Sequence, residues 1–301
     1  MTKRMKAAEA APLLIMGGLF VLIDFLALWV AEPFRTSSTV AFGNPNDPWN
    51  LVYFFLTVIV FTAALLLVSK FWKKQAVKII VLGTVTVFNV YVFYYLLAAV
   101  LNLGWSLGLS LAASVIILTV LVKNPEWYVI DISGVLSSVG VIVVMGISLS
   151  ISIVLVLLIV MAVYDAVSVY KTKHMIDLAS TSLEQKLPML FIIPKKRGYS
   201  FVKEAESLKE KLRTGEKREA LFVGLGDVIF PGLLVVSAFH FLGSNALLVA
   251  LSVMVGTLIG FIALAAFVIK GKPQAGLPFL CTGAIVGYLV ASYLIFGALV
   301  T

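Results

Sequence analysis

The chain has few of the residues on which many catalytic centres depend. It contains one cysteine, Cys281, and two histidines, His174 and His240, and only 13% of its 301 residues are charged. A single cysteine excludes an internal disulfide and a thiolate metal cluster. The two histidines are far apart, which excludes the H-E-x-x-H motif of zinc peptidases. We therefore expect neither a metal nor a cofactor.

Long apolar runs dominate the sequence, of which 61% is hydrophobic. A helix that crosses about 30 Å of hydrocarbon needs about 20 such residues in a row. None of the runs alternates like a β-barrel strand, so helices are expected to satisfy the backbone in lipid. The sequence predicts an all-α polytopic membrane protein with nine transmembrane helices. We expect these helices at residues 13–31, 50–69, 77–101, 105–122, 128–147, 150–170, 220–241, 245–269 and 275–300.

These helices are expected to form a single membrane domain over residues 1–301. Helices one to six cover about 13–170, a cytoplasmic loop covers 171–219, and helices seven to nine cover about 220–300. The first apolar run is longer than the core of a secretory signal, so we interpret it as a retained span.

The positive charges predict the orientation. If the N-terminus is cytoplasmic, all of the 23 Lys and Arg residues except Arg35 lie on the cytoplasmic side. A bias of this kind sets the topology of membrane proteins. We expect a multi-pass protein of the cell membrane, with a cytoplasmic N-terminus and an extracytoplasmic C-terminus. The net charge of +8 is then a topological signal, and no nucleic-acid partner is expected.

The loop 171–219 is the only long segment expected outside the membrane. Its second half, YSFVKEAESLKEKLRTGEKREA, predicts a short charged helix. Its first half contains LPMLFIIP, an apolar stretch between Pro188 and Pro194. This stretch is either a strip on the membrane interface or a gate or edge strand that pairs with an extended substrate.

Two aspartates lie within apolar segments, Asp165 in IVLVLLIVMAVYDAVSVY and Asp227 in ALFVGLGDVIFPGLLVV. A carboxylate in a membrane helix costs about 3 kcal/mol on insertion scales, so it usually faces a partner or a watery cavity. At 1.5 Å per residue, Asp165 lies about 9 Å from Lys171 and Asp227 about 12 Å from Glu219. If helices six and seven are antiparallel neighbours, the two side chains are level.

Two carboxyls within a few ångström hold one proton between them. The ionised carboxyl can take a proton from water while the protonated one polarises a carbonyl. This chemistry suits hydrolysis of a peptide bond through a tetrahedral diol. A polar pair that links two helices, or a proton relay in a transporter, would explain the aspartates equally well.

The residues around Asp227 favour an enzyme. Gly224 and Gly226 leave room for the close approach of a substrate backbone, and Pro231 frees a backbone carbonyl and permits a bend. Helix packing is the alternative role for such glycines. GxxxG-type spacing, which is typical of helix packing in membranes, occurs at Gly104/Gly108, Gly256/Gly260 and Gly283/Gly287.

Three short motifs resemble those of the presenilin and signal-peptide-peptidase family of intramembrane aspartyl proteases. Tyr164-Asp165 is similar to the YD motif, and Gly224-Leu225-Gly226-Asp227 is similar to the GxGD motif. The third signature of the family is Pro-Ala-Leu at the start of the last helix, and Ala275-Gly276-Leu277-Pro278 stands at that position. The chain resembles archaeal-type presenilin homologues most, and the resemblance also covers the nine-helix count and the long loop.

The resemblance implies an intramembrane aspartyl protease in which Asp165 and Asp227 are catalytic. It implies a supporting or substrate-binding role for a further set of residues: Tyr164, Gly224, Leu225, Gly226, Gly276, Leu277 and Pro278. Its expected partners are transmembrane-helix substrates and the lipid bilayer, and a homo-oligomer is compatible with it. The predicted orientation matches presenilin, whereas signal peptide peptidase has the opposite one.

Two other functions remain as alternatives. A proton-coupled transporter would use the two aspartates as proton carriers, and it would predict inverted repeats, of which the sequence has no clear sign. A prepilin-type peptidase also has a GxGD aspartate but lacks the accompanying YD and Leu-Pro elements. Two further acidic residues have ordinary explanations: Asp24 is expected to snorkel or to pair helices, and Asp131 to face the positive end of a helix dipole.

Overall fold

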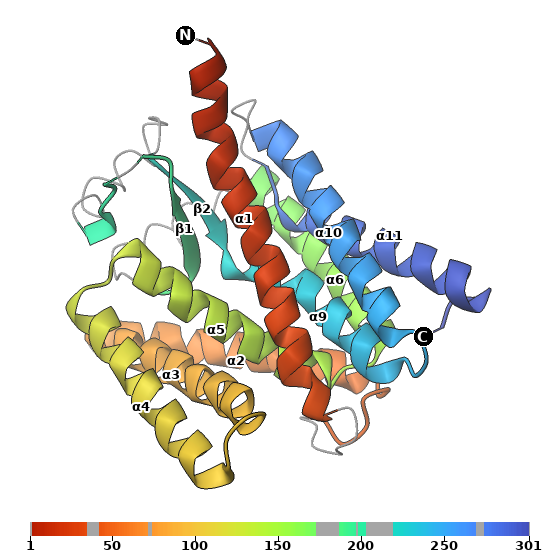
Figure 1. The fold of residues 1–301 in the computed structure, drawn as a ribbon, viewed down its shortest axis with the longest axis horizontal. Helices are drawn as coiled ribbons and strands as arrows, with labels where there is room; N and C mark the ends of the chain where they lie inside the picture. Colours follow the sequence, from red (N-terminus) through yellow and green to blue (C-terminus); the bar gives the residue numbers. More distant parts are fainter. Residues whose placement is uncertain are drawn as a thin grey trace.

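The structure is a computed structural model that describes residues 2–34, 42–71, 74–172, 187–196, 198–202, 219–268 and 274–300. In these ranges the chain forms nine α-helices and a two-stranded sheet (Figure 1). The helices are α1 (Thr2–Ala31), α2 (Trp49–Phe71), α3 (Lys74–Ala98), α4 (Leu103–Lys123), α5 (Trp127–Gly146), α6 (Ile151–Val167), α9 (Leu225–Phe241), α10 (Ala246–Val268) and α11 (Leu277–Phe296). The strands are β1 (Leu190–Pro194) and β2 (Ala220–Gly224). A 3₁₀ turn follows α1 at Glu32–Phe34, and a π-helical turn follows α6 at Ser168–Thr172.

Most of these helices can cross a membrane. Among the described residues, seven are long and apolar enough: α1, α3, α4, α5, α6, α10 and α11. Two shorter apolar helices accompany them, Trp49–Ala64 within α2 and Leu225–Phe241, which is α9. The chain is therefore a multi-pass, mainly helical membrane protein.

The sheet corrects two expectations from the sequence, since the fold is not all-α. Residues 220–224 were expected to open helix seven, but they form β2, which pairs antiparallel with β1 so that Leu190 faces Gly224. A short apolar run does not distinguish a strand from a helix, and here pairing with β1 decides the outcome. Because α9 begins only at Leu225, Asp227 is its third residue. The depth of about 12 Å counted from Glu219 was therefore wrong.

The stretch LPMLFIIP also differs from an interface strip. Its residues Phe191, Ile192 and Ile193 are at most 2% exposed, and they belong to a strand that already has a partner within the chain. An ion pair between Lys196 and Glu219 closes the end of this hairpin. The charged helix expected in the second half of the loop falls mainly on residues 203–218, outside the described ranges.

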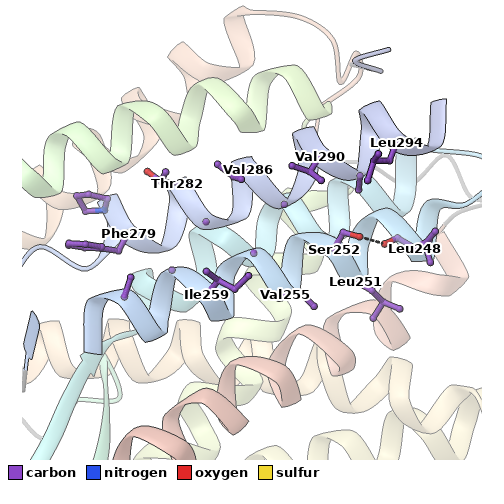
Figure 2. A pocket seen from close by; sticks show the side chains of 17 residues that line it. Leu248, Leu251, Ser252, Val255, Ile259, Phe279, Thr282, Val286, Val290 and Leu294 are labelled. Atoms are coloured by element: carbon purple, nitrogen blue, oxygen red, sulfur yellow. Dashed lines mark hydrogen bonds between the residues drawn. The ribbon is translucent and has the colours of Figure 1, made fainter. Parts of the chain in front are cut away.

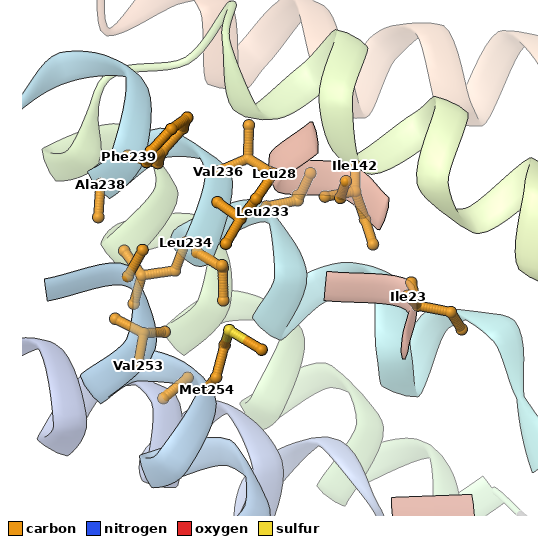
Figure 3. Packing of buried hydrophobic residues seen from close by; sticks show 14 of the residues in the cluster. Ile23, Leu28, Ile142, Leu233, Leu234, Val236, Ala238, Phe239, Val253 and Met254 are labelled. Atoms are coloured by element: carbon orange, nitrogen blue, oxygen red, sulfur yellow. The ribbon is translucent and has the colours of Figure 1, made fainter. Parts of the chain in front are cut away.

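Helix α9 is the centre of the core. Each residue from Leu233 to Ala238 is at most 1% exposed, because α1, α5, α6, α10 and α11 all pack against this helix. Figure 3 shows Leu233, Leu234 and Val236 surrounded by side chains of α1, α5 and α10. The labelled neighbours are Ile23 and Leu28 of α1, Ile142 of α5, and Val253 and Met254 of α10. From Pro231 to Phe239 the helix that carries Asp227 is thus buried among its neighbours, whereas its first turn is half-buried.

Helices α10 and α11 cross at very short range. A methyl group built on Gly256 would overlap the backbone of Gly283, and one on Gly260 would overlap that of Phe279. Two of the three predicted glycine pairs, Gly256/Gly260 and Gly283/Gly287, therefore serve this crossing. The third pair differs, since methyl groups on Gly104 and Gly108 would meet nothing within 4 Å.

A groove of about 830 Å³ runs along the crossing of α10 and α11 (Figure 2). Its walls are apolar side chains such as Val255, Ile259, Val286 and Leu294. Pro278 lines one end, close to the start of α11, but neither Asp165 nor Asp227 lines the groove.

Candidate active site

Asp165 lies near the end of α6 and faces the first turn of α11. Its side chain is 2% exposed, and its carboxylate accepts a hydrogen bond of 3.0 Å from the N–H of Leu277. The N–H of Gly276 also interacts with this carboxylate. The first N–H groups of a helix have no acceptor within it and carry partial positive charge. The start of α11 therefore supplies a binding site for the Asp165 carboxylate.

The sequence of α11 suits this arrangement. Gly276 is its N-cap, and Pro278 lies in its first turn. A proline is tolerated there because the N–H that it lacks would have no partner in the helix. Leu277 lies between these residues and donates the N–H that reaches Asp165.

Asp227 is the third residue of α9, directly after β2. Its carboxylate interacts with the backbone of Gly224, the N-cap of the helix. A side chain at the third helical position commonly reaches back to the N-cap N–H in this way. Pro231 has no N–H to donate to the Asp227 carbonyl, so the first turn of α9 lacks one of its usual hydrogen bonds. The Asp227 side chain is half-buried.

The two carboxyls meet at the Gly276–Leu277 peptide. A methyl group on Gly276 would lie 3.1 Å from both carboxylate oxygens of Asp227, while the next residue, Leu277, binds Asp165. Asp165 and Asp227 are close enough to interact electrostatically. Oδ1 of Asp165 is buried and has no hydrogen-bond partner among the described residues.

The other residues singled out from the sequence divide between this place and the surface. Leu225 and Gly226 lie in the first turn of α9, beside Asp227. A methyl group on Gly224 would lie 3.6 Å from Oδ2 of Asp227, an ordinary contact. Tyr164 is adjacent to Asp165 in sequence but projects outward, with its side chain 64% exposed.

Sequence reasoning missed several residues near the aspartates. Tyr170 donates a hydrogen bond of 2.8 Å to Oε1 of Gln274, which joins the turn after α6 to the segment before α11. Cys281 is fully buried one turn after Leu277, and it interacts electrostatically with both aspartates. The spacing of four between Leu277 and Cys281, which places both on one face of α11, could have identified the cysteine. No sequence signal pairs Tyr170 with Gln274.

No metal centre is apparent in the part of the chain that the structure describes. Three or more His, Cys, Asp or Glu side chains do not gather anywhere in it as they would around an ion. Asp165 and Asp227 are a pair of oxygen donors beside backbone N–H groups. This arrangement can bind and share a proton, and it can orient a water molecule.

Comparisons with known proteins agree on one group. A family profile described as signal-peptide peptidase, presenilin aspartyl protease matches residues 17–298. Two crystal structures of a presenilin family intramembrane aspartate protease, in space groups C222 and P2, superpose with TM-scores of 0.70 and 0.69. They are 35% and 34% identical to this chain, cover 94% of it, and are themselves covered over 99% and 98% of their length. No match was found among curated proteins.

Proposed function

The chain belongs to the signal-peptide peptidase and presenilin family and is an intramembrane aspartyl protease, and we propose that Asp165 and Asp227 form its catalytic pair. The observation that carries this proposal is the convergence of both carboxyls on the Gly276–Leu277 peptide. The motifs around these two residues resemble those that carry the family's catalytic aspartates, and the comparisons give the transporter alternative no support.

The proposed reaction is hydrolysis of a peptide bond by activated water. Two adjacent carboxyls share one proton. The ionised one accepts a proton from water as the water oxygen attacks the substrate carbonyl, while the protonated one transfers its proton to the carbonyl oxygen, which gives a diol. As the diol collapses and the C–N bond breaks, the leaving nitrogen takes the proton that came from water, and a diol hydroxyl returns its proton to the other carboxylate. The donors from α11 hold Asp165 in place throughout.

The proposed substrates are transmembrane helices of other membrane proteins, which must unwind locally before they can be cut. Their freed backbone groups need partners, because unpaired groups in lipid cost several kcal/mol each. The edge of β2 that faces away from β1 offers such partners. Hydrogen bonds from Lys195 to Glu219 and from Leu225 to Met189 fix which residues face β1, so the backbone of Phe222 faces the other way. An extended substrate on this edge would lead directly to Asp227.

We extend the proposal to topology. Nine crossings, with α2 and α9 added to the seven longer spans, would put the N-terminus in the cytoplasm and the C-terminus outside, in agreement with the distribution of Lys and Arg. Single cysteines at Thr2 and Ala298, in a Cys281→Ala background, would be exposed to an impermeant maleimide in intact cells. Labelling of the cysteine at position 298 alone is expected. Labelling of the cysteine at position 2 alone would show that the protein has the opposite orientation.

The decisive experiment compares wild-type protein with Asp165→Asn and Asp227→Asn on a labelled transmembrane peptide in lipid vesicles. Each substitution keeps the size of the side chain but removes the shared proton, so cleavage should stop while the thermal unfolding temperature stays close to that of wild type. Asp24→Asn is the matched control, because Asp24 is a carboxyl of α1 that is only 3% exposed and packs against Gly232 rather than the pair. Normal turnover by either pair variant would remove that aspartate from the mechanism.

The substrate path has its own test. A photoreactive amino acid at Phe222 should crosslink to a bound peptide, whereas the same group at Leu294, in the groove of α10 and α11, should not. Crosslinking only at Leu294 would place the substrate away from β2 and contradict the path.

A further inference from the structure

Asp131 of α5 is a buried acidic residue that the reaction does not use. Its side chain is 9% exposed, and its Oδ1 accepts a hydrogen bond of 2.8 Å from the N–H of Ile192 in β1. Among the described residues, this N–H is the one hydrogen-bond donor at the carboxylate. Asp131 therefore binds the backbone of a strand. The sequence suggested only an interaction with the dipole of a helix.

The bond lies on the side of β1 that faces away from β2. Residues 189 and 195 of the β1 segment pair by hydrogen bonds with residues 225 and 219, and donors alternate in direction along a strand. The N–H of Ile192 therefore projects away from β2, on a side where the described ranges contain no further strand to accept its hydrogen bond. Asp131 supplies the missing acceptor and attaches β1 to α5.

Gly134, one turn after Asp131, provides a second contact from the same face of α5. A methyl group on Gly134 would lie 3.1 Å from Cε1 of Phe191 and 3.6 Å from Cδ1 of Leu225. The first of these residues belongs to β1, and the second is the first residue of α9. One face of α5 thus contacts both the strand and the start of the helix that carries Asp227.

A third contact fixes the segment that follows β1. Glu126, the N-cap of α5, accepts hydrogen bonds of 2.7 Å from the Ser200 hydroxyl and 3.0 Å from the N–H of Phe201. The start of α5 therefore binds the chain both within β1 and in the segment that follows it. These contacts make α5 the support of β1 and of the two residues, Ser200 and Phe201, that lie after it.

The hairpin in turn sets the place of Asp227. The N–H of Leu225 donates a hydrogen bond of 3.2 Å to the carbonyl of Met189, just before β1. The carboxylate of Asp227 interacts with the backbone of Gly224, which pairs with Leu190 of β1. A shift of β1 is therefore transmitted to the first turn of α9. A misplacement of about 1 Å at a catalytic group can lower the rate by about 10²-fold.

We propose that Asp131 is a positioning residue for Asp227, which acts by anchoring β1 to α5 and, through the β1–β2 pairing, orienting the first turn of α9. The inference rests on the proposed function for its kinetic readout. It assigns Asp131 a larger effect on kcat than on KM, because the geometry of the Asp227 carboxyl tolerates less displacement than the pairing of a substrate with β2.

The test compares Asp131→Leu with Asp131→Asn in the vesicle assay. Leucine removes the acceptor and leaves the N–H of Ile192 buried and unpaired, so kcat should fall by about 10- to 10²-fold with KM within about twofold of wild type. Asparagine keeps an oxygen acceptor of the same size at the same place, so its kcat should stay within about threefold of wild type.

Ser237→Ala is the matched control. The Ser237 hydroxyl donates a buried hydrogen bond of 2.9 Å to the carbonyl of Leu149, but it lies about 15 Å along α9 from Asp227 at 1.5 Å per residue. Its loss should lower the unfolding temperature without lowering kcat. A fall in kcat equal to that of Asp131→Leu would mean that any lost bond to α9 has this effect, and it would overturn the proposal.

Three further results would overturn it: wild-type kcat in Asp131→Leu, a rise in KM alone, or an equal loss of kcat in Asp131→Asn. If Asp131→Leu does not fold, Gly134→Ala takes its place. It keeps every hydrogen bond but pushes the Phe191 ring of β1 with one methyl group, which would lie 3.1 Å from Cε1, so the same selective loss of kcat is expected. Unchanged kcat in this variant would count against the proposal.

Hydrogen exchange separates failure of this inference from failure of the proposed function. The amides of Ile192 and Leu225 should exchange faster in Asp131→Leu than in wild type or Ser237→Ala, whether or not any peptide is cleaved. Faster exchange at Ile192 with unchanged exchange at Leu225 would show that the anchor does not reach α9. Loss of cleavage in Asp227→Asn, measured alongside, reports on the proposed function alone.

Discussion

The carboxylate of Asp165 and the backbone N–H of Leu277 are joined by a hydrogen bond of 3.0 Å, although 112 residues separate them in sequence. The donor belongs to the backbone at a helix start, so its direction is set by the fold of α11 rather than by a side-chain rotamer. The residue before it, Gly276, is the one that Asp227 approaches. Both carboxyls therefore lie beside one peptide unit, which holds Asp165 by a hydrogen bond and contacts Asp227 through Gly276.

A shared proton predicts a bell-shaped dependence of kcat/KM on pH. At low pH both carboxyls are protonated and neither can accept a proton from water. At high pH both are ionised and neither can polarise the substrate carbonyl. Cleavage rates of the labelled peptide, measured across the range in which the protein stays folded, should fall on both sides of a maximum. A rate that rises to a plateau at high pH would contradict the need for a protonated member.

Enlargement of Gly276 should impair catalysis in proportion to the added volume. The methyl group of Gly276→Ala would lie 3.1 Å from the oxygens of Asp227, so the carboxyl must move by a few tenths of an ångström, and kcat should fall by less than about tenfold. Valine at this position demands a larger shift and should abolish cleavage.

The control for this series is Gly18→Ala, since a methyl group on Gly18 of α1 would meet nothing within 4 Å. It should cleave at the wild-type rate. Equal activity of Gly276→Val and wild type would show that Asp227 does not approach Gly276 during catalysis.

The sequence predicted the parts of this site that depend on composition and local motifs. Asp165 and Asp227 are conspicuous because a carboxylate is rare in an apolar run, and the order of apolar runs places the α-helices to within a few residues at most ends. The strands were not predicted, because a run of five apolar residues has no periodicity that distinguishes a strand from a helix. Whether ALFVG becomes a strand depends on its pairing with LFIIP, 26 residues away at the nearest point.

The supporting contacts were beyond the sequence for a related reason. Asp131 appeared to be an ordinary acidic residue at a helix start, and only the packing of β1 against α5 brings it to the N–H of Ile192. The acceptor is a side chain, but the donor is a backbone N–H, which every residue except proline carries. The identity of residue 192 therefore does not reveal the bond. Contacts of this kind follow from the tertiary fold alone.

The bond between Tyr170 and Gln274 should contribute modestly to catalysis. It joins the turn after Asp165 to the segment before Gly276, and an exposed hydrogen bond contributes about 0.5–1.5 kcal/mol. Tyr170→Phe should therefore lower kcat by at most about tenfold, the factor reached when all of this energy holds the site in its active geometry. Tyr293→Phe, at an exposed tyrosine of α11, should have no effect in the same assay. A loss of the same size in both variants would show that the effect is not specific to this bond.

The crossing of α10 and α11 should be the least tolerant place in the membrane domain for an added methyl group. Alanine in a helix is intrinsically favoured over glycine by about 1 kcal/mol, so Gly108→Ala, with open space around it, should leave the unfolding temperature in detergent unchanged or raise it. Gly256→Ala carries the same intrinsic gain, but its methyl group would overlap the carbonyl oxygen of Gly283, and overpacking of this kind costs about 1–3 kcal/mol. It should unfold at a lower temperature than wild type.

Because α11 also begins at the Gly276–Leu277 peptide, the separation of these two helices should displace the donors of Asp165. Gly256→Ala should therefore lose activity below the temperature at which it unfolds. Unfolding of both variants at the same temperature would mean that the two helices can separate without cost.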